Sequence, residues 1–151
     1  MSYSEQLRRI VRQYRRNGQS WPATTHDIAA WAIRQRLWEP HPSRVLNQCA
    51  DELGRALREE YLTDPQGRKV RAKHVANIRS AGRQLALWDD IRTASREHMS
   101  VAFQQRRQQI VGDCRQLKVD VDSYNENRSA ERPIQMIFDF TLDLAEIELA
   151  A

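Results

Sequence analysis

Residues 61–73 read Tyr-Leu-Thr-Asp-Pro-Gln-Gly-Arg-Lys-Val-Arg-Ala-Lys, with Asp-Pro-Gln-Gly at positions 64–67. Proline at the second position and glycine at the fourth position are typical of a β-turn. Short extended stretches flank this turn, so the segment predicts a β-hairpin. Its second strand carries four cations within six residues: Arg68, Lys69, Arg71 and Lys73. A hairpin cannot bury that many charges, and we expect it to present them to a partner.

The sequence before this hairpin predicts three helices. The first covers about residues 4–17, where apolar side chains recur at helical spacing among arginines. The second begins at a Thr24 or Thr25 cap and ends near Arg36. A turn with two prolines precedes the third, which is capped by Ser43 or has Pro42 in its first turn. One face of the third helix is apolar, and we expect it to join a core: Val45, Leu46, Cys49 and Leu53.

The sequence after the hairpin is dominated by one long helix. Residues 76–87 have a weak pattern and are interpreted as a connector. The helix is expected from Asp89 or Asp90 to about residue 125, followed by a polar loop over 129–133, a strand over 134–140 and a terminal helix over 141–151. Apolar residues seven apart form an incomplete heptad seam on the long helix: Phe103, Ile110, Leu117 and Tyr124.

That seam needs a cover, because a half-apolar helix is not stable alone in water. Two different segments could pack on the seam. The segment 134–140 can fold back onto the helix, or a second copy of the chain can pair with it. We favour a homodimer through the 89–125 helix.

Charge divides the chain into two parts. Residues 1–83 hold 16 Lys and Arg against 8 Asp and Glu, a net of +8, whereas residues 84–151 hold 8 against 12, a net of −4. We therefore expect a polyanion-binding domain over 1–83 and an acidic helical extension over 84–151. The alternative is that the arginines are solvated helix faces. No apolar run is long enough to span a bilayer, and two distant cysteines do not make a disulfide framework, so a cytoplasmic location without membrane contact is expected.

The order helix, short strand, helix, helix, basic hairpin resembles the winged helix-turn-helix domain over about residues 4–76. The segments that carry the resemblance are 24–29 (Thr-Thr-His-Asp-Ile-Ala), 42–46 (Pro-Ser-Arg-Val-Leu) and 64–71. The resemblance implies a mainly α fold of three helices plus a β-hairpin wing, here followed by a long helix and a short C-terminal strand and helix. It also implies that the third helix enters the major groove of duplex DNA, while the wing contacts the backbone or the minor groove. Pro40 and Pro42 lengthen the turn before the third helix relative to the tightest members.

Candidate base-reading residues lie at the start of the third helix, where such helices contact base edges. They are Ser43, Arg44, Asn47 and Gln48. Arginine can bond guanine O6 and N7, and asparagine or glutamine can bond adenine N6 and N7. The candidate phosphate contacts are Arg68, Lys69, Arg71 and Lys73 of the wing. The alternative is that the helix residues are ordinary solvent-facing polar side chains.

The sequence contains no recognisable catalytic or metal-binding pattern. The histidines, His26, His41, His74 and His98, have no metal-ligand spacing with the cysteines, and no phosphate loop or nucleophile motif is present. We therefore expect no enzyme activity, metal or cofactor. The sequence predicts a duplex DNA-binding protein, either a transcriptional regulator or a mobile-element accessory protein. The alternative is a protein-interaction adaptor built on a winged-helix-like scaffold.

Overall fold

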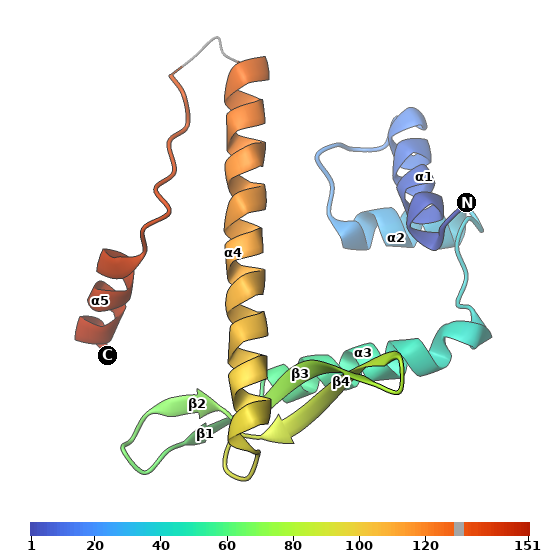
Figure 1. Ribbon diagram of the computed structural model, residues 1–151. Coiled ribbons are helices and arrows are strands. Elements are labelled where there is room, and N and C mark those ends of the chain that lie inside the picture. The colour runs from blue at the N-terminus through green and yellow to red at the C-terminus, as the bar shows by residue number, and fades with distance from the viewer. Residues whose placement is uncertain (129–131) are drawn as a thin grey trace. The chain divides into compact units, whose positions relative to one another are not determined.

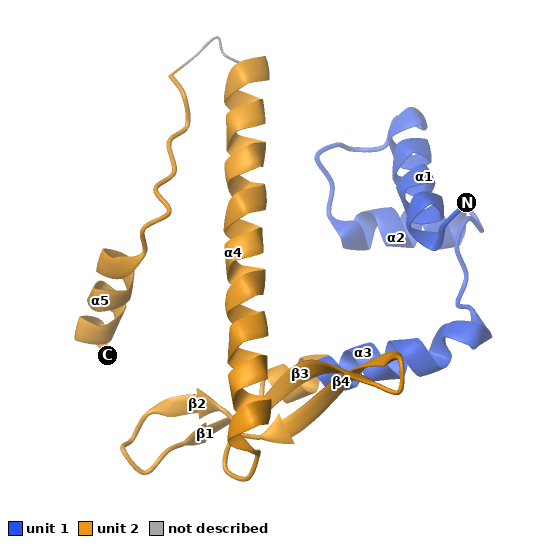
Figure 2. Ribbon diagram, viewed as in Figure 1, with its two compact units in different colours: residues 1–54 blue, residues 55–151 orange. Residues whose placement is uncertain are grey.

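The computed structural model describes residues 1–128 and 132–151, and these residues are mainly helical, with two β-hairpins (Figure 1). The chain divides into two compact units, residues 1–54 and residues 55–151 (Figure 2). The loop expected over 129–133 falls largely outside the described residues. Within the described ranges, no helix combines the length and the apolar character needed to cross a bilayer.

The first two helices are confirmed, and each is capped as its sequence requires. Helix α1 spans Tyr3–Arg16, and the Ser2 hydroxyl and Glu5 carboxylate bond each other's backbone N–H groups in a capping box. Helix α2 spans Thr25–Arg34, and the Thr24 hydroxyl accepts from the Asp27 N–H at 3.0 Å. These caps satisfy N–H groups that have no partner inside the helix.

The core of the first unit lies between α1 and α2. Its buried members are Ile10, Tyr14, Trp31 and Ala32. The rings of Tyr14 and Trp31 meet edge to face with centroids 5.5 Å apart, an arrangement that aromatic quadrupoles favour. Trp38 packs against this cluster, and its Nε1 donates to the Tyr3 hydroxyl at 2.8 Å.

The third helix forms where expected, but its apolar face is not buried. A 3₁₀ turn over Pro42–Arg44 (η1) leads into α3, Val45–Arg58. Val45 is 62 % exposed and Leu46 is 80 % exposed, and Leu53 and Cys49 are also exposed, so the predicted core face is wrong. The physical reason is that the first core is already closed by α1 and α2, while α3 begins in one unit and ends in the other.

The predicted hairpin is confirmed. Strands β1 (Tyr61–Thr63) and β2 (Lys69–Arg71) pair antiparallel, with Leu62 opposite Val70. The turn is closed by the Asp64 N–H, which donates to the Arg68 carbonyl at 2.9 Å, and Gly67 takes the positive φ of 86° that other residues rarely adopt.

A second, longer hairpin occupies the region that we expected to be a connector, so that prediction is wrong. Strands β3 (Lys73–Ser80) and β4 (Arg83–Asp90) pair antiparallel along their whole length. Ala81 and Gly82, with φ of 51° and 75°, form the two-residue turn, and two positive φ values match the twist of a tight hairpin. A domain boundary at residue 83 would separate these two bonded strands.

Helix α4 begins later than expected, at Arg96, and ends at Asn127. The predicted start at Asp89 or Asp90 is wrong because both residues belong to β4, and a turn bonded to the Asp90 carbonyl follows them. Ser95 is the cap, and its hydroxyl accepts from the His98 N–H at 3.1 Å. The first turns of α4 pack on β3, where they bury Ala76, Met99 and Ala102.

The C-terminal segment contains a helix but not the expected strand. Helix α5 covers Thr141–Ala150, as predicted. Residues 132–140 adopt no regular structure, so the strand prediction for 134–140 is wrong. Their alternating pattern suits a strand, but none of the described strands pairs with them. The segment is instead held at its start, where the Asn125 side chain bonds both backbone groups of Ile134, at 2.8 and 3.0 Å.

Candidate nucleic-acid interface

The start of α3 presents all four candidate base-reading residues to solvent. Ser43 and Arg44 lie in η1, and Asn47 and Gln48 follow in the first turn of α3. The guanidinium carbon of Arg44 lies 3.5 Å from the centre of the Tyr3 ring, a cation–π contact that holds the side chain over α1. Gln48 Nε2 donates to Glu52 Oε1 at 3.3 Å. The four side chains are accessible, and two of them already have a partner within the first unit.

Two of the candidate phosphate contacts, Arg68 and Lys69, are exposed on the β1–β2 hairpin. Asp64 accepts from the Arg68 backbone N–H at 2.8 Å and from Arg68 Nε at 2.8 Å, and these bonds lower the pKa of the Asp64 carboxyl. The Arg68 side chain nevertheless stays 73 % exposed. Lys69 Nζ lies 4.8 Å from the centre of the Tyr61 ring. The turn therefore fixes where both cations are presented, although the Asp64 charge offsets part of the Arg68 charge.

Lys73 does not lie on the second strand of the β1–β2 hairpin, as expected, because that strand ends at Arg71 and Lys73 begins β3. There it belongs to an ionic network with Glu60, which follows α3, and Asp90, which ends β4. Its Nζ lies 3.0 Å from Glu60 Oε2 and 3.2 Å from Asp90 Oδ2, and only 25 % of its side chain is exposed. The hydrogen bond to Glu60, followed by the one to Asp90, raises the pKa of Lys73. Two carboxylates therefore already offset this charge.

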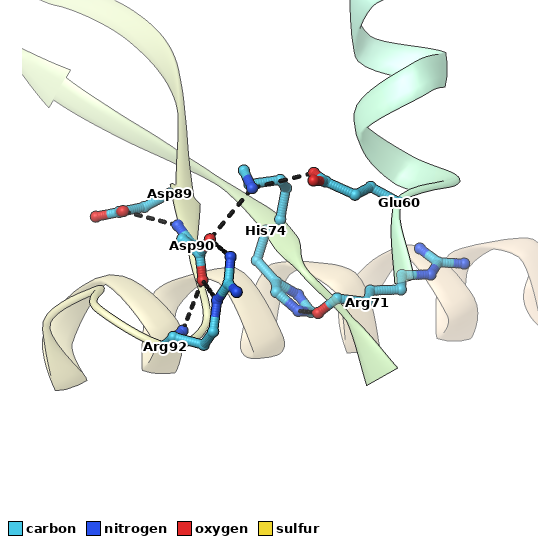
Figure 3. A network of polar contacts seen from close by, with 7 residues as sticks. Glu60, Arg71, His74, Asp89, Asp90 and Arg92 are labelled. Atoms are coloured by element: carbon cyan, nitrogen blue, oxygen red, sulfur yellow. Dashed lines mark hydrogen bonds and ion pairs between the residues drawn. The ribbon is translucent and has the colours of Figure 1, made fainter. Parts of the chain in front are cut away.

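Asp90 is the centre of the network (Figure 3). Arg92 binds it through Nε at 2.9 Å and Nη2 at 2.7 Å, and the Arg92 backbone N–H donates to it at 2.8 Å. These bonds, with that of Lys73, hold the pKa of Asp90 well below its ordinary value of 3.8. A carboxylate with this many donors is ionised at neutral pH, and its bonds hold Arg92 and Lys73 at the end of β4.

Arg71, the fourth wing residue, is positioned through its backbone. The buried His74 ring donates from Nε2 to the Arg71 carbonyl at 2.9 Å (Figure 3). The ring of Phe103 from α4 meets the His74 ring edge to face, with centroids 5.3 Å apart. His98, also on α4, donates from Nε2 to the His74 carbonyl at 3.0 Å. A carbonyl only accepts, so both Nε2 atoms carry a hydrogen. The two histidines thus connect α4 to the base of the hairpin.

A further basic site was missed by the sequence reasoning. Arg79 and Arg83 are exposed at the tip of the second hairpin, beside the Ala81–Gly82 turn. The sequence feature that could have revealed this hairpin is Gly82, which lies between two stretches of extended character. Ala-Gly, however, is a weaker turn signal than Asn-Gly or Asp-Gly. The hairpin, and with it the basic tip, was therefore not predicted.

The candidate residues thus fall into two groups. The four helix residues belong to the first unit and the four hairpin residues belong to the second. Among the residues that the structure describes, no group of three or more His, Cys, Asp or Glu side chains is arranged to hold a metal ion. The chain matches no protein-family model, no curated protein and no solved structure.

Proposed function

We propose that the chain binds duplex DNA in the manner of a winged helix, as a transcriptional regulator or a mobile-element accessory protein without catalytic activity. The observation that carries the proposal is the order of elements in residues 1–71. Three helices are followed directly by an antiparallel hairpin whose returning side holds exposed cations. The net charge of +8 over residues 1–83 supports a polyanionic partner.

In this proposal the start of α3 reads base edges. Arg44 bonds a guanine, and Asn47 or Gln48 bonds an adenine, because these side chains match the donor and acceptor pattern of those bases in the major groove. In the same proposal Ser43, at the preceding turn, bonds a phosphate. Docking on DNA would move the Arg44 guanidinium from the Tyr3 ring to the base, so the cation–π contact with Tyr3 competes with base reading.

The hairpin supplies the phosphate contacts. We assign them first to Arg68 and Lys69, which are the more exposed of the four candidate cations. Lys73 is paired with Glu60 and Asp90 and contributes less net charge, and Arg71 lies beside it at the base of the hairpin. These two residues orient the hairpin and extend its positive side.

The test is the salt dependence of duplex binding. Each neutralised phosphate contact contributes about 0.9 to the slope of log K against log salt concentration. Replacing Arg68 and Lys69 by alanine together should lower that slope by about 1.8 on any duplex sequence. Lys118→Ala is the control, because Lys118 is an exposed cation of α4 outside the proposed surface. A slope that the double substitution leaves unchanged would remove the hairpin from the interface.

Base reading is tested separately. Asn47→Ala should cost about 1–3 kcal/mol on a preferred site and much less on random duplex. Cys49→Ser, an exposed neighbour on α3, is the matched control. Equal losses of affinity on both kinds of DNA would mean that Asn47 anchors the backbone and reads no base.

One observation favours a second candidate function, a protein-interaction adaptor. Val45, Leu46 and Leu53 are exposed on α3, and apolar side chains gathered on one helix are typical of a protein-docking surface. An adaptor would show no salt-dependent affinity for random duplex. The titration described above therefore separates the two functions.

A further inference from the structure

The two parts of α4 have different surroundings. Up to Gln105 the helix packs on β3, and the Gln105 side chain bonds the backbone of Asn77. Residues 106–127, here called the distal α4 segment, extend for about 33 Å at about 1.5 Å per residue. This segment keeps large apolar side chains exposed, among them Ile110, Leu117 and Tyr124.

Three of these side chains lie along one line of the helix together with two half-buried ones, Cys114 and Val121. Successive members are four, three, four and three residues apart: Ile110, Cys114, Leu117, Val121 and Tyr124. This alternation is the seam of a helix that packs against another helix. Val111 and Val119 are exposed as well, but they lie off the seam.

The charges of the distal α4 segment are divided along its length. Residues 106–119 contain four Lys and Arg and one Asp, a net of +3, whereas residues 120–127 contain three acidic residues and no basic one, a net of −3. Two such segments side by side in parallel would place like charges together. In antiparallel orientation each basic end would lie beside an acidic end, so the segment is complementary to itself.

We propose that two copies of the chain associate through antiparallel pairing of their distal α4 segments. The seam sets the register. Cys114 lies opposite Leu117 of the second copy, and Ile110 lies opposite its Val121. At each end Arg107 lies against the Tyr124 ring of the second copy, which is a favourable cation–π pair.

The C-terminal segment adds apolar area to this interface. A stable interface buries about 800 Å² of each partner, more than one helical seam of this length provides. Asn125 holds Ile134 beside the end of the distal α4 segment. From there to the terminus eight large apolar side chains are exposed: Ile134, Met136, Ile137, Phe140, Leu142, Leu144, Ile147 and Leu149. Residues 133–151 carry four acidic and no basic side chains. In the antiparallel pair they start beside Arg106 and Arg107 of the second copy, where their charge is complementary.

The first test uses two matched substitutions in the full chain. Leu117 is 45 % exposed and Val119 is 47 % exposed on the same helix, but only Leu117 lies on the seam. Sedimentation equilibrium should give a dimer for the unaltered chain. Leu117→Glu should weaken its association by more than about a hundredfold, because each copy would bury a charge at the centre of the pair. Val119→Glu should leave the association within about twofold. Circular dichroism should show the same helix content in all three proteins.

The second test addresses orientation. In the antiparallel register Cys114 lies opposite position 117 of the second copy, whereas in a parallel pair it would lie opposite the second Cys114. In a background with Cys49→Ser, which removes the other thiol, Leu117→Cys should give a disulfide-linked dimer on mild oxidation, and peptide mapping should find Cys114 joined to the cysteine introduced at position 117. The same background without Leu117→Cys should not link through Cys114. Parallel pairing predicts the reverse, a bridge between the two Cys114 side chains.

Three results would overturn the proposal. An unaltered chain that stays monomeric at tens of micromolar would mean that its own C-terminal segment covers the seam. Equal effects of Leu117→Glu and Val119→Glu would mean that the seam is not the interface. A disulfide between the two Cys114 side chains, with none between Cys114 and the cysteine introduced at position 117, would reject the antiparallel orientation. None of these measurements uses DNA, so they stand or fall separately from the proposed function.

Discussion

The two hairpins of the second unit have the same connectivity but differ in burial: no strand residue of β1–β2 is buried, whereas His74 and Ala76 of β3 are. The β1–β2 hairpin has strands of three residues, a turn rich in sequence signals and mostly exposed side chains. The β3–β4 hairpin has strands of eight residues and a turn with a weak signal, and β3 packs against α4. The turn sequence therefore specifies the first hairpin, whereas the packing of α4 on β3 specifies the second. A conspicuous turn sequence marks the hairpin that is free to contact a partner, whereas the hairpin that stabilises the unit depends on contacts distant in the sequence.

The largest effect that this comparison predicts concerns Ala76 on β3. Its side chain is 0 % exposed, beneath α4. Ala76→Glu would force a charge into that contact and should destabilise the second unit by about 4 kcal/mol, measured by urea unfolding. Thr63→Glu, at an exposed position of β1, should change stability by no more than about 0.5 kcal/mol. Similar losses for both substitutions would show that the two hairpins are equally important for stability.

The next effect concerns Asp90, which joins the end of β4 to Arg92 and Lys73. Asp90→Asn should lower the melting temperature by several degrees at neutral pH, because the bonds that depress the Asp90 pKa favour the folded state. A depressed carboxyl pKa stabilises the fold above the ordinary value of 3.8, and this stabilisation is lost as the pH falls below it. The difference between the two proteins should therefore be constant above about pH 5 and shrink in acid. Asp113→Asn, at an exposed position of α4, should show no such pH dependence. A difference that persists unchanged in acid would mean that Asp90 acts through something other than its charge.

A smaller effect is expected at Gln105. Its side chain accepts from the Asn77 N–H and donates to the Asn77 carbonyl, both at 2.8 Å. Gln105→Ala removes both bonds and should cost about 1–2 kcal/mol. Gln104→Ala, on the exposed side of the same helix, should cost about 0.5 kcal/mol or less. Amide hydrogen exchange should show faster exchange of Asn77 only in the first variant, and equal protection in both would contradict the role of Gln105.

The smallest effect compares the two turn glycines directly. Gly67 and Gly82 both have positive φ, and neither has a neighbouring atom where a Cβ would be added. Replacement by alanine therefore costs only backbone strain, about 1 kcal/mol at each position. Gly82→Ala should lower the global stability of the second unit, whereas Gly67→Ala should accelerate local opening of β1–β2 and leave global stability nearly unchanged. Equal global losses in hydrogen exchange and urea unfolding would mean that the first hairpin is as tightly coupled to the core as the second.

Local signals predicted the elements that depend on local chemistry. Thr24 caps α2 as expected, the Asp64 turn closes β1–β2, and the terminal helix forms over 141–150. The start of α4 was misplaced because Asp89 and Asp90 suit a helix start as well as a strand end. Their pairing with His74 and Lys73 depends on residues that are distant in the sequence.

The candidate site was predictable only in part. The sequence identified the exposed cations of β1–β2 but not the pairing of Lys73 with Glu60 and Asp90, since Asp90 is 17 positions away along the chain. The apolar face of α3 was expected to be buried because its spacing is regular. Spacing shows that a face is apolar, but it does not show whether a core is available to receive it.

The bonds of Gln105 to Asn77 have a consequence for the unbonded edge of β3. An open strand edge offers N–H and C=O groups to any other extended chain, and this is how folded proteins join into aggregates. The Gln105 amide occupies one such pair of groups, in place of a third strand. One side chain of α4 thus blocks part of the edge that would otherwise accept a foreign chain.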